Sequence, residues 1–392
     1  MPVVSAFAAD TPVNMAGLYL HIPFCKSRCI YCGFYSTTAL SLRQRYVDAL
    51  CGEMALRRDS WHPIFTDGPD TIYFGGGTPS MLTMPQLQQL FEAVARHFYP
   101  DGQAITAREV TMECNPDDVS HEFVAQLCQL PVNRVSMGVQ TFSDELLRFL
   151  GRRHTARQAV EAVSLLRQGG IANISIDLMY GLPGTSLDGF RHDIDQALAI
   201  APDHLSAYCL SYEPSTPLHR MLDQGRVEEV DEELERAMYY ELVDRLTANG
   251  YEHYEISNFA RPGYRSLHNS SYWADVPYLG IGAAAHSYDQ RSRQWNTDDM
   301  DCYIQAIASG HTCEESEQMD QDTRYNDRLT TALRTREGLS LDCLTTAQRH
   351  YCLCQAKKLI DGGLLINEAD RLRLSRSGLF VSDMVISSLM LV

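Results

Sequence analysis

Three cysteines share one short loop near the start of the chain. Cys25, Cys29 and Cys32 have the spacing C-x3-C-x2-C within LYLHIPFCKSRCIYCGFYS. Three thiolates can each bind one iron of a four-iron, four-sulfur cluster, and the fourth iron then needs another ligand. The next cysteine, Cys51, falls in a helix-like segment and is poorly placed to supply it. The spacing therefore predicts a [4Fe–4S] cluster with one iron open to a further molecule.

Two other interpretations of these cysteines stay open at this point. Structural zinc takes four ligands from Cys and His at short spacings, and His21 could be the fourth. The thiols could also be unrelated core side chains, since cysteine is among the residue types most often buried.

A glycine run ends the next strand-like segment. Gly75-Gly76-Gly77-Thr78-Pro79 follows the apolar residues 71–74. Residues without a side chain leave backbone N–H groups exposed and let a ligand approach closely. No Lys follows at the spacing of a phosphate-binding P-loop. The run therefore predicts a ligand contact of another kind, with a purely structural tight turn as the alternative.

Polar side chains recur near the ends of later strand-like segments. Glu113, Gln140 and Asp177 follow or lie within such segments, and Arg152 lies at a helix end between two of them. A buried carboxylate is costly without a partner, so Asp177 in the apolar run 174–179 needs one. The sequence predicts a bound ligand there, and an ion pair between Arg152 and Asp177 is the structural alternative.

A histidine and two aromatic residues lie close together in HNSSYW, residues 268–273. His268 could be an axial ligand of haem iron, or a hydrogen-bonded core residue, and spacing alone does not decide between them. Residues 280–285, GIGAAA, match the dinucleotide fingerprint G-x-G-x-x-A, but the polar run after them is unlike a helix. We interpret that stretch as closely packed backbone.

These residues must be positioned by an alternation of strands and helices. The predicted strands lie at residues 18–22, 71–74, 109–114, 134–139, 173–179 and 204–211. Six strands that alternate with helices predict an α/β fold with a parallel sheet, a partial (β/α)6 barrel open on one side. In such barrels the chemistry lies at the C-terminal ends of the strands, where the cysteine loop, the glycine run and Glu113 all fall.

The pattern predicts four parts of the chain. Residues 1–16 form an N-terminal tail and 17–213 the barrel, followed by an extension over 214–300 that carries HNSSYW and has few helical signals after residue 260. Residues 301–392 form a smaller C-terminal α+β domain, with a hairpin over 364–374.

Charge and composition limit the possible partners. In 392 residues, 33 Lys and Arg against 50 Asp and Glu give a formal net charge of −17, which argues against general binding to nucleic acid or anionic lipid. No run approaches the ~18 apolar residues of a membrane span, although peripheral membrane contact stays open. Twelve scattered cysteines, and no basic region before the triplet Ala6-Phe7-Ala8 to suggest a secretory signal, favour the cytoplasm.

Several motifs together carry a resemblance to a known family over residues 18–380. They are YLHIPFCKSRCIYCGF, FGGGTPS, TMECNP, RVSMGVQTF, GRRH, IDLMYGLPG, YEISNFARPG, HNSSYW and YLGIGAAAH. The chain resembles the radical S-adenosylmethionine (SAM) superfamily, and within it the HemW-type haem chaperones, relatives of oxygen-independent coproporphyrinogen III oxidase.

The resemblance implies cofactors and the residues that hold them. Cys25, Cys29 and Cys32 would bind three irons of a [4Fe–4S] cluster, and SAM would chelate the fourth. The family's SAM contacts map onto Tyr19, Gly76, Gly77, Thr78, Glu113, Gln140, Arg152 and Asp177. In active members the reduced cluster cleaves SAM to methionine and a 5′-deoxyadenosyl radical. The resemblance does not say whether this chain cleaves SAM productively.

Two departures favour the chaperone over the oxidase. The oxidase loop has a fourth cysteine, C-x3-C-x2-C-x-C, where this chain has Gly33-Phe34. Only 24 residues precede Cys25, whereas the oxidase has a longer N-terminal extension. HNSSYW matches the chaperones' haem motif H-N-x-x-Y-W, which implies haem bound through His268 and passed to acceptor haemoproteins. The oxidase, or a cluster-bearing binding module with no haem role, are the alternatives.

Overall fold

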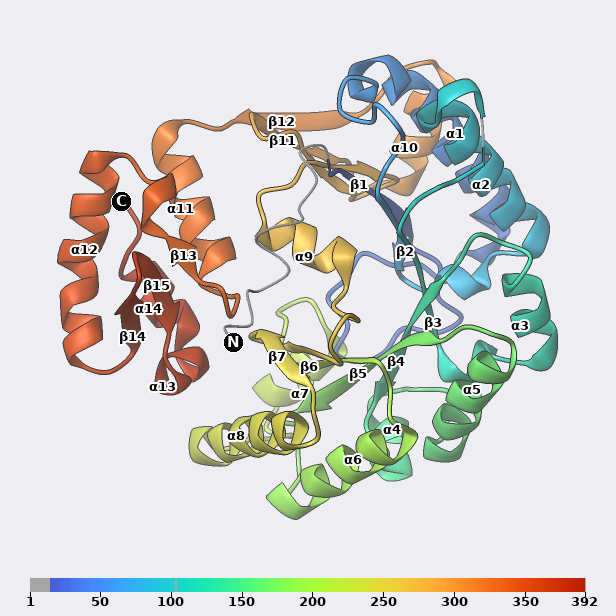
Figure 1. Cartoon of the computed structure of the whole chain (residues 1–392). Coiled ribbons are helices and arrows are strands. Elements are labelled where there is room, and N and C mark those ends of the chain that lie inside the picture. Colours follow the sequence, from blue (N-terminus) through green and yellow to red (C-terminus); the bar gives the residue numbers. More distant parts are fainter. Residues whose placement is uncertain (1–14, 103, 392) are drawn as a thin grey trace.

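Six parallel strands form the centre of the protein, whose computed structural model describes residues 15–102 and 104–391. They are β1 (Gly17–Ile22), β2 (Thr71–Gly76), β3 (Glu109–Cys114), β4 (Arg134–Gln140), β5 (Asn173–Tyr180) and β6 (His204–Cys209). They lie in chain order within a sheet of twelve strands, which curves but does not close on itself in the part of the chain described (Figure 1). The predicted partial (β/α)6 barrel is therefore confirmed. The predicted tail over 1–16 and the triplet Ala6-Phe7-Ala8 fall outside the described residues up to residue 14.

Helices between these strands cover the outer face of the sheet (Figure 1). They are α1 (Arg43–Trp61), α2 (Met84–Phe98), α3 (His121–Leu127), α4 (Asp144–Phe149), α5 (Ala156–Gln168) and α6 (Leu187–Ile200). The hydroxyls of Ser143 and Thr155 cap α4 and α5, as their positions before apolar-periodic runs predict. The first helix begins at Arg43, and residues 40–42 before it form a separate 3-10 turn.

The two faces of the strands differ in chemistry. In β3, Val110 and Met112 pack into the core under the helices, whereas the alternate residues Glu109, Thr111 and Glu113 face the other way. Every one of the latter is polar, so the inside of the barrel is a polar lumen. Buried polar groups need partners, so the side chains of this lumen must bond to one another or to a bound molecule.

The predicted extension adds strands to both edges of the sheet. β8 (Asn258–Ala260) pairs with β6, and β7 (Glu252–Glu255) pairs with β8, whereas β9 (Tyr278–Ile281) pairs parallel with β1. Beyond β9 lie β10 (His286–Tyr288), β11 (Ser292–Asn296) and β12 (Glu314–Gln318). The remaining helices of this part are α7 (Pro217–Asp223), α8 (Glu232–Ala248) and α10 (Met300–Ala308).

A short helix, α9 (Leu267–Trp273), connects the two edges and lies across the opening of the barrel (Figure 1). The carboxylate of Glu109 in β3 accepts hydrogen bonds from the backbone N–H of Leu267 at 2.8 Å and of His268 at 2.9 Å. A carboxylate at a helix N-terminus compensates the unpaired N–H groups there. The prediction that this stretch is not helical was wrong, because Glu109, which is distant in sequence, holds the N-terminus of α9 together with the local cap of Ser266.

The C-terminal residues form a separate core. α11 (Gln321–Ala332), β13 (Leu339–Ser340), α12 (Thr346–Asp361), β14 (Leu365–Glu368), β15 (Arg371–Leu374), α13 (Arg376–Phe380) and α14 (Ser382–Ser387) enclose it. The predicted hairpin over 364–374 is confirmed by β14 and β15. This part contacts β7 of the extension through the Arg334–Glu255 ion pair at 2.9 Å. The four predicted domain boundaries stay predictions.

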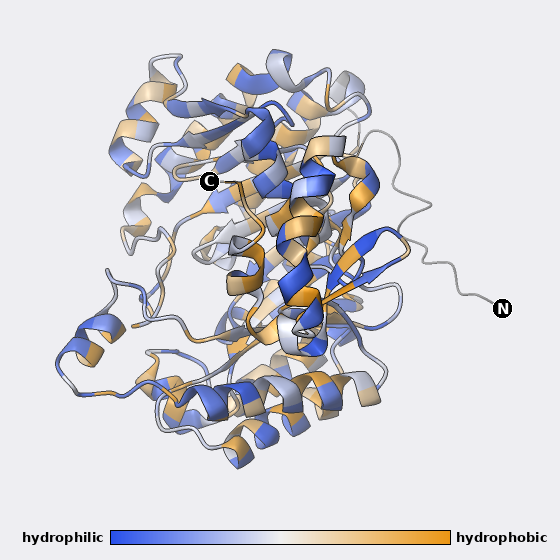
Figure 2. Ribbon diagram, turned by 90° about the vertical axis from the view of Figure 1, so that its left-hand side faces the viewer, coloured by the Kyte–Doolittle hydropathy of each residue, from blue (hydrophilic) through white to orange (hydrophobic). Residues whose placement is uncertain are grey.

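Hydrophobic and hydrophilic residues alternate along the helices (Figure 2). Across residues 15–102 and 104–391, no helix has the length and apolar character needed to cross a membrane.

One buried carboxylate joins the barrel to the added strands. Glu53 of α1 is fully buried, and its oxygens accept hydrogen bonds from Arg57 Nε at 3.0 Å and Asn296 Nδ2 at 2.8 Å. They also accept from the N–H of Gly282 at 2.8 Å and from the hydroxyl of Tyr303 at 2.6 Å. Four donors from four segments therefore depend on one side chain.

Glu53→Gln should destabilise the protein by about 3 kcal/mol, because the amide cannot accept from all four donors and removes the nearer of the two carboxylates that pair with buried Arg57. Urea unfolding followed by circular dichroism measures this. Glu92→Gln on the exposed face of α2 is the matched control, expected to change stability by no more than about 0.5 kcal/mol. Equal unfolding midpoints for the two variants would contradict the stabilising role assigned to Glu53.

Candidate cluster and cofactor site

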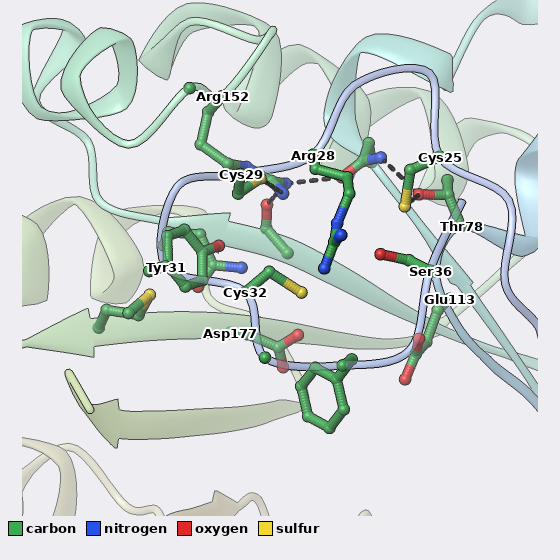
Figure 3. A pocket seen from close by; sticks show the side chains of 18 of the residues that line it. Cys25, Arg28, Cys29, Tyr31, Cys32, Ser36, Thr78, Glu113, Arg152 and Asp177 are labelled. Carbon is green, nitrogen blue, oxygen red and sulfur yellow. Dashed lines mark hydrogen bonds between the residues drawn. The ribbon is translucent and has the colours of Figure 1, made fainter. Parts of the chain in front are cut away.

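A pocket of about 600 Å³ lies at the C-terminal ends of the barrel strands (Figure 3). Its volume falls in the range typical of small-molecule sites, about 300–1,000 Å³. The predicted site residues that line it are Cys25, Cys29, Cys32, Gly76, Gly77, Thr78, Glu113, Gln140, Arg152 and Asp177. These residues come from segments spread over 150 positions of the sequence, and the fold brings them to one place.

Tyr19 is the predicted SAM contact that does not line the pocket. Its hydroxyl lies 3.0 Å from Nδ1 of His21, and its ring stacks on Tyr73 with ring centres 6.1 Å apart. Tyr19 therefore lies within the lumen, beneath the pocket.

The cysteine loop is fixed at both ends and its thiols face the pocket. The backbone N–H of Cys25 donates to the carbonyl of Thr37 at 2.9 Å, and that of Ile30 donates to Leu150 at 3.1 Å. Burial raises the pKa of the Cys25 and Cys32 thiols, so both hold their protons at neutral pH until a metal displaces them. Three half-buried thiols on one loop around a pocket fit a three-cysteine cluster.

His21 does not complete a zinc site with these thiols. Its Nε2 lies 3.1 Å from the carbonyl oxygen of Tyr35, and its Nδ1 contacts the hydroxyl of Tyr19. A Cβ added at Gly76 would lie 2.5 Å from the ring of His21, so the ring packs under the glycine run. Both ring nitrogens are used, which disfavours the zinc interpretation.

The glycine run passes so close to the cysteine loop that side chains would not fit. Gly76 has φ +112°, and a Cβ on Gly77 would lie 2.7 Å from the backbone of Pro23. The N–H of Gly76 donates to Glu113 at 3.1 Å. The run exposes backbone along one side of the pocket, as its composition predicts.

Two carboxyl groups occupy the floor of the pocket. Burial raises the pKa of Glu113 to about 7 and that of Asp177 to about 6. Glu113 accepts hydrogen bonds from the hydroxyl of Tyr73 at 2.7 Å and from Gly76, which oppose part of this shift. Two carboxyls that ionise near neutral pH suit a cationic ligand, because a bound positive charge favours their ionised forms.

Arg152 lies between the cysteine loop and the strands. Its guanidinium donates to Sγ of Cys29 at 3.5 Å, to Oδ1 of Asn115 at 2.6 Å and to the carbonyl of Gly138. Arg134 and a serine hydroxyl, rather than an ion pair with Arg152, oppose the raised pKa of Asp177 most strongly. Arg152 is thus oriented toward the cluster loop.

Gln140 lines the pocket from a strained backbone position. Its φ is +71°, and the pairing of β4 with β5 shifts register between Gly138 and Gln140. Residues other than glycine adopt this conformation at a cost, and such positions cluster at functional sites.

Some lining residues were not predicted. Asn115 holds Arg152, and its position two residues after Glu113 in TMECNP was the available signal. Ser136, Tyr208 and Glu213 also line the pocket. Nothing in their local sequence distinguishes them from ordinary strand and loop residues.

His268 does not line this pocket and lies in α9, inside the lumen. Its side chain is 1% exposed, with Nδ1 2.8 Å from Thr71 Oγ1 and Nε2 2.9 Å from the hydroxyl of Tyr272. Its ring stacks on Tyr73 at 5.0 Å. Burial lowers its pKa to about 3, so it is neutral. This is the hydrogen-bonded core histidine of the alternative interpretation, and its role as an iron ligand stays a prediction.

Comparison with known proteins agrees with this geometry. The family model described as Radical SAM superfamily matches residues 19–197, and that of the HemN C-terminal domain matches 319–381. A Mycobacterium tuberculosis protein named Heme chaperone HemW is 35% identical over 400 aligned positions, 99% of this chain and 98% of its own. The chain belongs to the HemW family of the radical SAM superfamily.

Two further comparisons extend this assignment. The Bacillus subtilis Heme chaperone HemW is 36% identical and aligns over 83% of this chain and 85% of its own. The solved structure of coproporphyrinogen III oxidase (HemN) from Escherichia coli, a radical SAM enzyme, superposes with a TM-score of 0.81 over 96% of this chain and 90% of that one, at 22% identity. That likeness shows the fold alone. Membership of the superfamily implies SAM and a [4Fe–4S] cluster, which the pocket residues fit.

The affinity for SAM should depend on pH through Glu113. SAM carries two positive groups, a sulfonium and an ammonium. The ionised fraction of a carboxyl with a pKa of about 7 increases roughly tenfold between about pH 6 and about pH 8. The affinity of the protein for SAM should therefore rise by a similar factor over this range. Anaerobic calorimetry with the reconstituted cluster measures this. Glu113→Gln should bind more weakly and lose most of the rise, whereas Glu122→Gln on exposed α3 should behave as wild type. A pH-independent wild-type affinity would refute this role.

Proposed function

We propose that this protein is a cytoplasmic haem chaperone that binds haem at the HNSSYW segment and delivers it to acceptor haemoproteins. The observation that carries the proposal is family membership over nearly the whole chain, with relatives named Heme chaperone HemW. Retention of the complete motif H-N-x-x-Y-W in α9 supports it.

We propose that Cys25, Cys29 and Cys32 hold the cluster and that SAM occupies the rest of the pocket. When bound, SAM supplies a sulfonium that a reduced cluster can cleave. The residues of this chain orient it: Glu113 and Asp177 face its positive groups, and Thr78 and the glycine backbone line its extended chain. Gln140 and Arg152 face the same space. Tyr19 would influence bound SAM only indirectly, through the stacking of its ring on Tyr73.

Oxidative decarboxylation of coproporphyrinogen III is the second candidate function. The position after Cys32 argues against it, because Gly33-Phe34 replaces the fourth cysteine of the oxidase loop. A Cβ added at Gly33 would lie 2.9 Å from Glu213, and the side chain of Phe34 is 73% exposed at the pocket. The segment thus presents an exposed apolar ring where the oxidase has a thiol.

Replacing Cys25, Cys29 and Cys32 together by Ala should abolish the broad visible absorption of the reconstituted cluster, because the other two cysteines that line the pocket, Cys114 and Cys209, lie at the ends of β3 and β6 and cannot replace three loop thiols. The matched control replaces Cys128, Cys302 and Cys354, which are exposed elsewhere, and should retain it. Iron and sulfide content are measured beside the absorption. A normal cluster in the variant without Cys25, Cys29 and Cys32 would contradict the assignment of these residues as its ligands.

The chaperone and oxidase functions differ in their products. The chain loaded with haem should convert an apo-haemoprotein to its holo form faster than free haem at equal concentration, followed by the acceptor's absorption. With dithionite, SAM and coproporphyrinogen III it should form no protoporphyrinogen over multiple turnovers. Multiple-turnover product would establish the oxidase, and absence of haem binding would exclude the chaperone.

A further inference from the structure

One buried arginine lies in the lumen beneath the cofactor pocket. Arg134 is the first residue of β4, is 1% exposed, and is the largest fully buried side chain in the described part of the chain. It faces the lumen together with Ser136, two residues further along the strand, which lines the pocket. Residues at this spacing lie about 7 Å apart along a strand. Arg134 therefore lies one layer of side chains below the floor of the pocket.

The guanidinium of Arg134 has few partners in the protein. Within residues 15–102 and 104–391, its Nε and Nη1 have no hydrogen-bond partner. Its register neighbours are Thr111 of β3 and Asn173 of β5, and Oγ1 of Thr111 and Oδ1 of Asn173 have none either. Ordered water satisfies buried polar groups where protein partners are missing. No hydrogen bond to an acid therefore neutralises the charge at Nε or Nη1.

The carboxylate that pairs with Arg134 is already engaged by α9. Nε of Arg134 lies 4.0 Å from Oε2 of Glu109, an ion pair without a hydrogen bond. The oxygens of Glu109 accept instead from the N–H of Leu267 at 2.8 Å, the N–H of His268 at 2.9 Å and the hydroxyl of Ser266 at 3.4 Å. The partial positive charge of the helix N-terminus offsets part of this carboxylate's charge. Part of the positive charge of Arg134 is therefore left to act on other groups.

The histidines and tyrosines near Arg134 are neutral at physiological pH. Burial, and then the charge of Arg134, lower the pKa of His268 to about 3 and that of His204 well below its usual value. Burial raises the pKa of Tyr73 and Tyr208, so both phenols keep their protons. Arginine is always protonated in proteins, so Arg134, unlike these groups, carries a charge.

Two carboxyls lie above this charge, at the floor of the pocket (Figure 3). Glu113 of β3 is one layer above Arg134 in the sheet register, and Asp177 is on the neighbouring strand β5. Burial raises the pKa of Asp177 to about 6, and Arg134 is the strongest of the influences that oppose this rise. Burial also raises the pKa of Glu113 to about 7, and the hydroxyl of Tyr73 opposes that rise more strongly than Arg134 does.

Asp177 also faces ionisable groups on other elements. Arg152, which follows α4, favours its ionised form, whereas Glu113 and Asp177 disfavour each other's ionisation. The remaining groups keep their protons near neutral pH because burial raises the pKa of each, and they are Cys114, Tyr73 and Tyr208. Arg152 lines the pocket, whereas Arg134 does not. Arg134 is thus a charge that can be removed without changing the lining of the pocket.

We propose that Arg134 is a positioning residue for the cofactor pocket: from beneath its floor, the guanidinium favours the carboxylate forms of Asp177 and Glu113 and so prepares the pocket for a cationic ligand. The inference rests on the proposed SAM site and adds to it a residue that does not touch the ligand. A cation within the pocket would repel the sulfonium of SAM. Behind the two carboxyls, Arg134 keeps them ionised without meeting the ligand.

Arg134→Gln should weaken SAM binding in a pH-dependent way. Loss of the charge raises the pKa of both carboxyls, so the affinity should fall about tenfold at about pH 6 and by no more than about twofold at about pH 8, where both are mostly ionised. Anaerobic calorimetry of the full chain with the reconstituted cluster measures this. Titrations in two buffers of different ionisation enthalpy count the protons released per SAM bound, and the variant should release more at about pH 7 than wild type.

Arg57→Gln is the matched control. Arg57 is also buried, at 5% exposed, but lies in α1 on the outer face of the sheet and pairs with Glu53. Its replacement should destabilise the protein in urea and leave the pH dependence of SAM binding as in wild type. If Arg134→Gln does not fold, Arg134→Met, of similar length and without charge, takes its place and should give the same pH-dependent loss.

Two results would overturn the proposal. An affinity reduced equally at every pH would show that Arg134 has only a structural role, and an affinity equal to that of wild type at every pH would show that it has no role in the pocket. Absence of SAM binding by wild type would instead refute the proposed cofactor site itself.

Discussion

The polar lumen of an incomplete barrel is the constraint on which the rest of the structure depends. Six strands leave two unpaired edges and an inward face of carboxylates, hydroxyls and a buried arginine, Arg134. Such groups are costly unless partnered. The chain satisfies many of them with α9, whose N-terminus is held by Glu109 and whose His268 bonds to Thr71. The segment that carries HNSSYW therefore also supplies partners for the lumen of the barrel.

Two cavities of different chemistry lie near the two ends of one lumen. The upper pocket has carboxyls that ionise near neutral pH and suits a cationic cofactor, whereas a smaller cavity beside α9 is lined by aromatic rings, arginines and two aspartates. Between them lie only a few side chains: Tyr73 donates to Glu113, and its ring stacks on His268.

Local patterns were sufficient to predict the elements and the upper pocket, because parallel strands end at one edge of a sheet and their terminal residues must meet there. Cys25, Gly76 and Glu113 could be grouped on that basis alone. The strands beyond β1 and β6 could not be placed in the same way, since their positions depend on contacts across more than 200 residues, such as Arg57 with Gln294. The helix α9 was missed because Glu109, 158 positions before Leu267, holds its N-terminus. Tyr19 does not line the pocket, and its role as a SAM contact, which the family resemblance implied, stays a prediction.

The likeness to an oxidase shows that a shared scaffold does not determine which reaction or ligand a protein takes. Both chains share the fold over most of their length, yet fold alone does not specify chemistry. One difference is local: Phe34 is exposed at the pocket where the family's oxidase loop has a thiol. An enzyme that generates a radical must enclose its substrate beside the cofactor, so an exposed ring at this position bears more directly on the function than the shared scaffold does.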